Sequence, residues 1–247
     1  MREQGTRALR CSCAAIAVSV LMIVASWTGP AMAQVSGNVG VVSNYLFRGV
    51  SQTDDEAAVQ GGFDFAHESG FYAGTWLSNV DFGGKEDTEV DLYAGYGGAF
   101  GNSGVTWDAG VIYYLFPGGG DLDYAETYLG LGYGLLSAGV AYTLWGEVSG
   151  ASGFDTGDFY YNVGLDLPFE LEQFSFSAFA GYYDFDEDGN PAAGNELSYA
   201  HWGLGASRDL GEFGSLGITY EQTDGGSEDA VATDDDVQIW LGWTLEF

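Results

Sequence analysis

The sequence has 247 residues, of which 36 are Asp or Glu and only six are Lys or Arg, so its formal net charge is −30. Such an excess of negative charge makes nucleic acid and anionic lipid headgroups poor partners. Acidic disorder is excluded as well, because 46% of the residues are hydrophobic and 16% are aromatic, and both kinds are regularly spaced.

Residues 1–33 have the pattern of a secretory signal peptide. A leader with three arginines precedes an uncharged apolar run over residues 14–25, and residues 31–33 read Ala-Met-Ala, a site for a signal peptidase. The apolar run is too short to span a membrane as a mature helix, which makes a membrane anchor the weaker interpretation. Cleavage after Ala33 would leave 214 residues with three basic and 35 acidic side chains, and without Cys11 and Cys13, the only cysteines.

The rest of the chain is predicted to form about twelve strands of the length that a tilted membrane strand needs. Apolar residues alternate with polar or small ones, as where Val90 and Leu92 alternate with Glu89 and Asp91. The face taken by Trp76 is left open. The predicted strands cover residues 37–48, 59–66, 71–81, 89–100, 105–116, 124–134, 136–145, 159–168, 174–183, 198–208, 214–223 and 236–247.

The last strand has the clearest alternation. Every second residue from Val237 to Phe247 is apolar, and the residues between them are mostly polar or small. An aromatic residue at the end of such a strand resembles the closing strand of a bacterial outer-membrane β-barrel, whose terminal Phe is part of the signal for the barrel-assembly machinery. Phe247 is therefore the expected assembly signal, and a half-buried strand of a soluble sandwich is the alternative.

The connections between the predicted strands alternate in length. Short ones fall near residues 67–70, 101–104, 134–136, 168–173 and 209–213, and long ones near 49–58, 82–88, 117–123, 146–158, 184–197 and 224–235. Short turns at one end and long loops at the other are typical of outer-membrane barrels. A soluble up-and-down barrel would have to place the large aromatic residues inside. We therefore expect an all-β, transmembrane, antiparallel up-and-down β-barrel over residues 34–247, with both termini in the periplasm.

Three residue types refine this expectation. Many glycines fall on the predicted inner face, where they leave space in the lumen. Tyr and Trp residues near strand ends fit the aromatic girdles of a membrane barrel. They are Tyr45, Tyr96, Tyr113, Tyr133 and Trp243.

Several short motifs resemble the TorF family of porin-like proteins. They are Asn38-Val39, Ser43-Asn44-Tyr45, residues 48–52 (Arg-Gly-Val-Ser-Gln), residues 71–74 (Phe-Tyr-Ala-Gly) with Trp76 and Ser78-Asn79-Val80, residues 89–96, and Tyr113-Tyr114 before Pro117-Gly118. The resemblance is densest from residue 38 to residue 118. It implies an outer-membrane barrel of the porin type, and it supplies no established substrate.

Carboxylates recur on the predicted inner face of the strands. Arg48 is the only cation that the pattern places inward, so several carboxylates would share one lumen. We expect a path that favours cations, and the alternative is that these charges pair locally. The inward acids are Asp64, Asp91, Asp108, Glu126, Asp166 and Glu221.

One predicted long loop carries a partial metal-binding motif. Asp184, Asp186 and Asp188 alternate before Gly189, and carboxylates in this pattern can surround Ca²⁺ with oxygen ligands. The position where an EF-hand has its last acidic ligand holds Asn195, and no predicted helix flanks the loop. A weak Ca²⁺ site is one interpretation and a solvated acidic loop is the other. No further cofactor is expected.

Catalytic residues are sparse in the predicted mature chain. Its two histidines are His67, in a predicted short turn, and His201, near the outer end of a predicted strand. No serine motif accompanies either of them, so we expect no enzymatic activity.

These patterns favour a porin-like channel for passive diffusion of small solutes across the outer membrane, biased toward cations or neutral polar molecules. Its expected partners are outer-membrane lipid, lipopolysaccharide and the barrel-assembly machinery. The alternative is a closed structural or surface-interaction barrel whose acidic loops bind divalent cations and bridge to lipopolysaccharide. The sequence leaves open whether the lumen is open or plugged, and ion conductance would distinguish the two.

Overall fold

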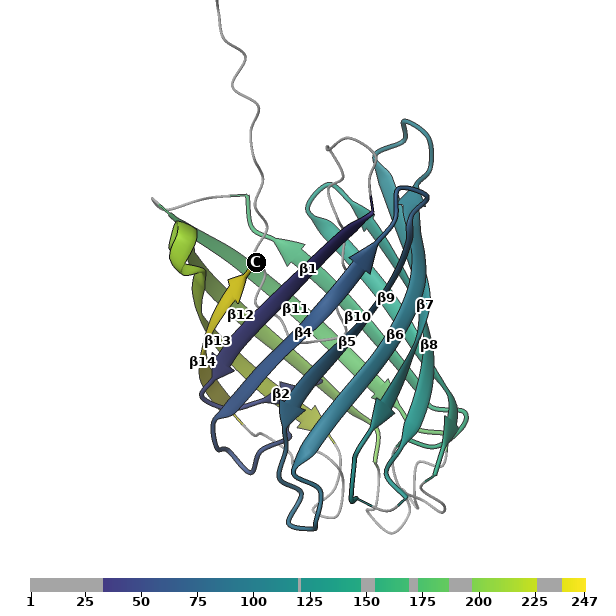
Figure 1. Cartoon of the computed structure of the whole chain (residues 1–247), viewed down its shortest axis with the longest axis vertical. Coiled ribbons are helices and arrows are strands. Elements are labelled where there is room, and N and C mark those ends of the chain that lie inside the picture. Colours follow the sequence, from purple (N-terminus) through teal and green to yellow (C-terminus); the bar gives the residue numbers. More distant parts are fainter. Residues whose placement is uncertain (1–32, 120, 148–153, 169–172, 187–196, 226–236) are drawn as a thin grey trace, which may run out of the picture.

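The computed structural model describes residues 33–119, 121–147, 154–168, 173–186, 197–225 and 237–247. Twelve antiparallel strands close into one barrel, in which each strand pairs with its neighbours in the chain and β1 also pairs with β14 (Figure 1). The strands are β1 Gln34–Val42, β4 Ala58–Ala66, β5 Phe71–Asn79, β6 Thr88–Ala99, β7 Val105–Leu115, β8 Tyr124–Tyr133, β9 Leu136–Gly146, β10 Phe159–Asp166, β11 Phe174–Asp184, β12 Tyr199–Asp209, β13 Ser215–Gly225 and β14 Val237–Glu246.

Helix is scarce in the described part of the chain. It contains the single 3₁₀ turn η2, Gly211–Phe213, in the short connection between β12 and β13. No helix within the described ranges is long and apolar enough to cross a membrane.

Closure of the barrel gives every strand a partner on both edges, so the ladder leaves no open edge of unpaired N–H and C=O groups. The seam between β1 and β14 extends to the last residue, because Gly37 and Phe247 exchange two backbone hydrogen bonds of 2.9 Å. The Phe247 side chain lies against Gly37 and is 70% exposed. This placement is compatible with the predicted assembly signal, which stays a prediction.

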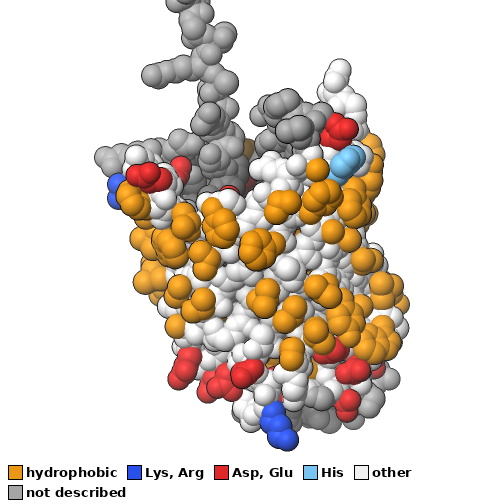
Figure 2. All heavy atoms as spheres, viewed as in Figure 1, with side chains coloured by type: hydrophobic (Ala, Val, Ile, Leu, Met, Phe, Trp, Pro, Cys, Tyr) orange, Lys and Arg blue, Asp and Glu red, His pale blue; other side chains and the backbone are white. Residues whose placement is uncertain are grey.

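Large apolar side chains point outward along the strands. On β14 the predicted alternation is confirmed, because Ile239 and Leu241 are 64% and 51% exposed while Trp240 between them is buried inside the barrel. Apolar side chains cover the middle of the wall in Figure 2, and charged ones gather toward the two ends. A closed barrel with such a belt has the surface that a bilayer requires.

The glycines of the inner face receive tyrosine rings from neighbouring strands. A Cβ atom on Gly95 or Gly110 would lie 2.3–2.4 Å from the hydroxyl oxygen of Tyr72 or Tyr128. Tyr93 fills the space at Gly74 in the same way. The sequence predicted that inner-face glycines such as Gly95 and Gly110 leave space in the lumen, and in the structure tyrosine rings fill the space at these two positions.

The first strand ends earlier than expected. The alternation predicted a strand over residues 37–48, whereas β1 ends at Val42 and the chain then turns into the barrel. Tyr45 was expected in an outer aromatic girdle, and this prediction is wrong because its side chain is only 2% exposed. Its ring contacts Trp76, which faces inward, edge-on at 5.4 Å between centroids.

We predict that Leu241→Arg impairs the barrel more than Thr244→Arg. Leu241 faces outward in the apolar belt, where an arginine costs about 2–4 kcal/mol at the bilayer midplane, whereas Thr244 faces the lumen. The heat-modifiable gel shift and the amount of folded protein in the membrane fraction measure the difference. Equal assembly of the two variants would contradict the assignment of faces.

Candidate functional site

Residues 43–57, which connect β1 to β4, form an inserted segment inside the barrel. Within it, β2 (Leu46–Phe47) and β3 (Val50–Ser51) pair as a hairpin. Arg48 and Gly49 make the two-residue turn with φ angles of 52° and 90°. Two positive φ angles define the type I′ turn, whose twist matches that of the paired strands.

Asn44 organises the base of the inserted segment. Its side-chain oxygen accepts hydrogen bonds from the hydroxyls of Ser51 (2.7 Å) and Thr53 (3.3 Å), and its amide nitrogen donates to Asp55 (2.8 Å). The backbone of Tyr45 is fixed as well, because its carbonyl accepts from the amide of Gln52 at 2.7 Å. The segment therefore has its own polar framework, which a solvated loop would not need.

The tip of the hairpin is pressed against the opposite wall. A Cβ atom on Gly49 would lie 2.8 Å from Cγ2 of Thr223 on β13 and 2.9 Å from Cβ of His201 on β12. The positive φ angle at Gly49 excludes larger residues for a second reason. Glycine is therefore required at this position both by the turn and by the contact.

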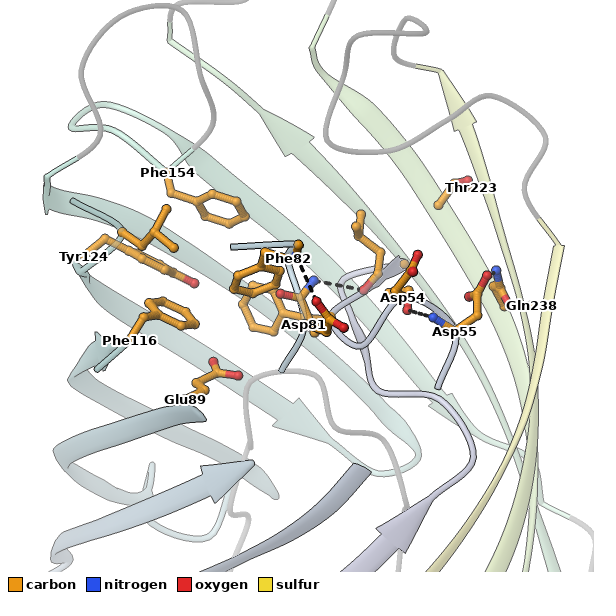
Figure 3. A pocket seen from close by; sticks show the side chains of 17 residues that line it. Asp54, Asp55, Asp81, Phe82, Glu89, Phe116, Tyr124, Phe154, Thr223 and Gln238 are labelled. Atoms are coloured by element: carbon orange, nitrogen blue, oxygen red, sulfur yellow. Dashed lines mark hydrogen bonds between the residues drawn. The ribbon is translucent and has the colours of Figure 1, made fainter. Parts of the chain in front are cut away.

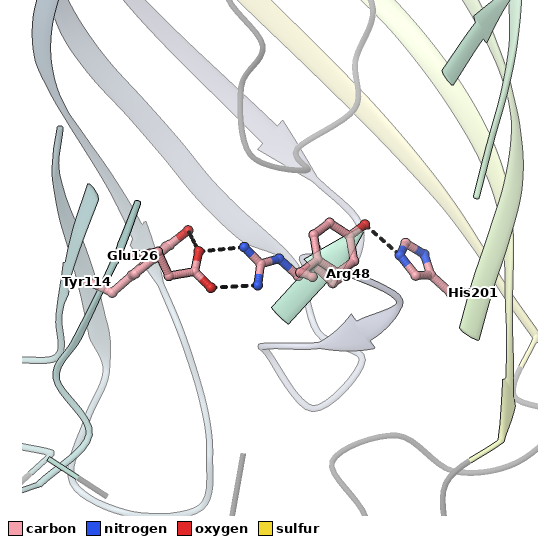
Figure 4. Close-up of polar contacts among 5 residues, drawn as sticks. Arg48, Tyr114, Glu126 and His201 are labelled. Carbon is pink, nitrogen blue, oxygen red and sulfur yellow. Dashed lines mark hydrogen bonds and ion pairs between the residues drawn. The ribbon is translucent and has the colours of Figure 1, made fainter. Parts of the chain in front are cut away.

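Arg48 is completely buried and forms a bidentate ion pair with Glu126 on β8. Its two terminal nitrogens lie 2.8 and 2.6 Å from the two carboxylate oxygens. Figure 4 shows how the two groups face each other. The guanidinium carbon lies 4.2 Å from the ring centre of Tyr160, and the Arg48 carbonyl accepts a hydrogen bond of 3.0 Å from the hydroxyl of Tyr199. The arginine thus connects the hairpin to strands on both sides of the lumen.

A second polar pair continues this network across the barrel. Nδ1 of His201 lies 2.8 Å from a carboxylate oxygen of Glu221, and Nε2 lies 2.8 Å from the hydroxyl of Tyr160. On the other side, the Tyr114 hydroxyl donates to Glu126 at 3.3 Å. Interactions of Arg48 and His201 therefore link strands β7 and β8 to strands β10, β12 and β13.

The structure brings most of the predicted inward acids into the lumen, but they differ in how deeply they are buried. Asp91, Asp108, Glu126 and Glu221 are buried, Asp64 is half-buried, and Asp166 is exposed near the short-turn end although it shares the inward face of β10. Arg48 lies inside as expected, on the hairpin and not on a strand.

Tyrosine hydroxyls are the main local partners of these acids. Tyr72 donates to Asp108 at 2.8 Å and Tyr93 donates to Asp64. Oδ1 of Asp91 and Oδ2 of Asp108 have no hydrogen-bond partner. Hydroxyl donors bring no positive charge, so this local pairing supplies no cation to balance the acids, and the predicted excess of negative charge in the lumen stays a prediction.

The predicted Ca²⁺ ligands are not gathered in the part of the chain that the structure describes. Asp184 and Asp186 are exposed, and Asp188 lies outside the described residues. No group of three or more His, Cys, Asp or Glu side chains within the described ranges is placed to hold a metal ion. The Ca²⁺ site therefore stays a prediction.

A neighbouring carboxylate, Asp158, fixes the connection between β9 and β10. It accepts hydrogen bonds from the backbone amides of Asp155 (2.9 Å) and Asp186 (3.0 Å). Burial raises the pKa of the Asp158 carboxyl above its ordinary value, although these amides oppose the shift.

The histidines take the positions that the sequence predicted. His67 lies in the short turn between β4 and β5. His201 lies on β12, where its ring forms hydrogen bonds with Glu221 and Tyr160. Within the described ranges, His201 forms side-chain hydrogen bonds with Tyr160 and Glu221 and with no serine or cysteine. The absence of enzymatic activity stays a prediction.

Sequence reasoning missed several residues of the lumen. Glu89 lies on the same face of β6 as Asp91, and the alternation placed the two together, but Glu89 was not counted among the inward acids. Tyr160 and Tyr199 also lie on inward faces and are no more than 2% exposed. They were missed because the inner face was expected to carry small or polar residues.

A family model described as a bacterial protein of unknown function (Gcw_chp) matches residues 27–240. Comparison with curated proteins gives no match. Among solved structures, a KdgM porin has a TM-score of 0.53 at 9% identity, covering 86% of this chain and 98% of its own. A NanC porin has a TM-score of 0.53 at 12% identity, covering 85% and 98%. At such low identity the likeness concerns the fold.

We predict that Arg48→Met lowers the free energy of unfolding by about 3–5 kcal/mol, because it leaves the Glu126 carboxylate buried without its partner. The double variant Arg48→Met/Glu126→Gln should lose less than Arg48→Met alone, since neither charge is then buried unpaired. Urea titration of the barrel in phospholipid vesicles measures both values.

Arg208→Met provides the matched control for this prediction. Arg208 is exposed, donates a hydrogen bond of 3.1 Å to Gln173 and lies 5.5 Å from the ring centre of Phe174, so its loss should change stability by about 1 kcal/mol or less. If Arg48→Met/Glu126→Gln loses as much stability as Arg48→Met and Glu126→Gln lose in sum when made singly, Arg48 and Glu126 are not coupled.

Proposed function

The chain belongs to the Gcw_chp family of bacterial proteins of unknown function, and from its structure we propose that it is an outer-membrane channel for small polar solutes with a preference for cations. The observation that carries the proposal is the contrast between the two faces of the wall. The outer face is an apolar belt, whereas the inner face holds buried carboxylates that no Lys or Arg neutralises. Such a barrel is suited to pass water-soluble molecules through a bilayer.

Charge counting inside the barrel supports the cation preference. Arg48 is the only Lys or Arg of the described ranges that lies in the lumen, and Glu126 already balances its charge. Asp91 and Asp108 are among the acids that remain, and each has an unpartnered oxygen. At an effective dielectric constant near 20, one such charge acts on an ion 8 Å away with about 2 kcal/mol.

The inserted segment sets the size limit in this proposal. Its hairpin contacts β8, β12 and β13 at the level of Arg48, so solutes have to be small or have to displace it. The negative lumen also makes an anionic solute a poor candidate, including oligogalacturonate, which a matching KdgM porin structure contains.

A closed barrel is the second candidate, and the burial of the hairpin favours it. Tyr45 is 2% exposed and Arg48 is 0% exposed, as in a protein core. In this alternative the barrel has a structural or surface role, and the acidic loops bind divalent cations that bridge to lipopolysaccharide. Conductance distinguishes the candidates, because a plugged barrel produces no ion steps.

Location and assembly are part of the same proposal. The signal peptide would direct export and be cleaved after Ala33, the barrel-assembly machinery would recognise Phe247, and the apolar belt would contact outer-membrane lipid. The long connections, which carry Lys85 and most of the loop acids, would face the cell exterior and lipopolysaccharide. The resemblance to the TorF family over residues 38–118 stays a prediction alongside these steps.

We predict that the purified barrel gives ion steps in a planar bilayer and that a KCl gradient produces a reversal potential of the sign expected for K⁺ selectivity. Unpaired carboxylates in a narrow path concentrate counter-ions and repel co-ions, so K⁺ should pass several-fold better than Cl⁻ in dilute salt. High salt should reduce the preference, because charges are screened within about 8 Å at 0.15 M.

The double variant Asp91→Asn/Asp108→Asn should move the reversal potential toward zero, whereas Glu68→Gln/Glu212→Gln, which removes two exposed carboxylates at the short-turn end, should leave it nearly unchanged. An anion-selective wild-type channel would contradict the proposed role of the lumen acids. If the folded barrel never conducts, the closed barrel replaces the channel as the proposed function.

A further inference from the structure

A cavity of about 610 Å³ lies between the inserted segment and the long connections of the barrel. The hairpin contributes Phe47 and Val50, and the connection between β5 and β6 contributes Asp81 and Phe82. Figure 3 shows Glu89 and three aromatic residues on one side, and Asp54, Asp55, Thr223 and Gln238 on the other. The volume is in the range of sites for small organic ligands.

Aromatic rings form one wall of this cavity. Phe154 and Tyr124 lie 5.0 Å apart between ring centroids, Tyr124 stacks on Phe116 at 6.4 Å, and Phe116 meets Phe82 edge-on at 5.7 Å. All four rings are among the lining residues. The wall therefore offers several π faces close together.

Phe154 reaches this wall through an unusual backbone conformation. Its φ angle is 71°, which a bulky side chain rarely adopts and which persists only when the surroundings enforce it. The hydrogen bond of 2.9 Å from the Asp155 amide to Asp158 fixes the next residue of the chain. Strained positions of this kind cluster at functional sites, so we take Phe154 as part of a ligand site.

The charged lining of the cavity is entirely acidic: it contains Asp54, Asp55, Asp81 and Glu89 and no Lys, Arg or His. Asp55 accepts hydrogen bonds from Asn44 (2.8 Å) and Gln238 (3.1 Å), and Asp81 accepts one from the amide of Gly83 (2.8 Å). The carboxylates of Asp55 and Asp81 are therefore engaged in hydrogen bonds that hold the wall of the cavity together.

Glu89 differs from them. Its side chain lies on the inward face of β6 and is 3% exposed, and its Oε2 atom has no hydrogen-bond partner. A buried acceptor without a donor is costly for the free protein. A donor brought by a ligand would remove that cost.

We propose that this cavity binds an organic cation, an ammonium group on an aromatic or similarly apolar body. The ammonium donates to Glu89, and the rings of Phe116, Tyr124 and Phe154 attract the cation and cover the apolar body. A bare metal ion would need several converging oxygen ligands and would gain little from the rings. An anion would meet only carboxylates.

The site adds to the proposed function by naming the class of solute that enters the channel. This naming rests on the proposed function. Binding itself does not depend on conductance, so the two can be tested separately. The probes are the 2-phenylethylammonium cation, neutral 2-phenylethanol and anionic phenylacetate, which are similar in shape and differ in charge. Isothermal titration calorimetry on the full barrel in detergent measures each dissociation constant.

We expect the ammonium probe to bind at least tenfold more tightly than either other probe. Glu89→Gln should weaken ammonium binding about tenfold and leave 2-phenylethanol unchanged, whereas Phe154→Leu should weaken both. Glu212→Gln, the same change in an exposed short turn, is the control and should have no effect. A heat-modifiable gel shift establishes that each variant is folded.

Equal binding of the three probes to the wild-type barrel, or no binding, would overturn the proposed site whether or not the variants fold. Unchanged ammonium binding by folded Glu89→Gln would also overturn it. Selective ammonium binding by a barrel that never conducts would keep the site and refute the channel. Cation-selective conductance without ammonium binding would keep the channel and refute the site.

Discussion

The buried ion pair between Arg48 and Glu126 determines how the interior of this barrel is organised. A charge with no exposed surface is tolerated only with a partner and further hydrogen bonds, and Arg48 has both. Because Arg48 is the tip of a hairpin, its pairing also fixes the position of residues 43–57. The first long connection therefore becomes a part of the barrel interior.

The rest of the interior follows from this insertion. Arg48 occupies a left-handed backbone conformation, which costs an L-residue about 1–2 kcal/mol, and the ion pair and the aromatic rings around the guanidinium offset that cost. Gly49 has no side chain, so the tip can approach β12 and β13 closely. The polar network from Glu126 to Glu221 then consists of groups that the hairpin brings together or shields from water. The cavity beside Glu89 exists because Phe47 and Val50 of the same hairpin form one of its walls.

The barrel itself could be predicted from the sequence because its wall depends on a local pattern. Alternation of period two identifies strands and their faces, as on β14, and the lengths of the connections indicate which end of the barrel they occupy. The inserted segment could not be recognised in this way. Tyr45 and Phe47 continue the apolar parity of Val39 and Val41, so the alternation extends past the true end of β1 at Val42.

The partners of the lumen acids could not be predicted for a related reason. Alternation places Glu126 and Glu221 inside the barrel, but it carries no information about the level at which each meets Arg48 or His201. The first distance depends on how the hairpin folds back toward Glu126, 78 positions further along the chain, and the second depends on the register between β12 and β13. The Arg-Gly turn was also inconspicuous, because Asn-Gly and Asp-Gly are the usual signals of a type I′ hairpin.

Accessibility of the inserted segment tests most directly whether it lies packed inside the barrel. The chain has no cysteine after residue 33, so single cysteines can be labelled with a membrane-impermeant maleimide on intact cells. Leu46 is 4% exposed and Asp54, in the same segment, is exposed. The account predicts that Leu46→Cys stays unlabelled until the protein is denatured, while Asp54→Cys reacts rapidly. Equal labelling of the two positions in the folded protein would contradict it, because the segment would then be an external loop.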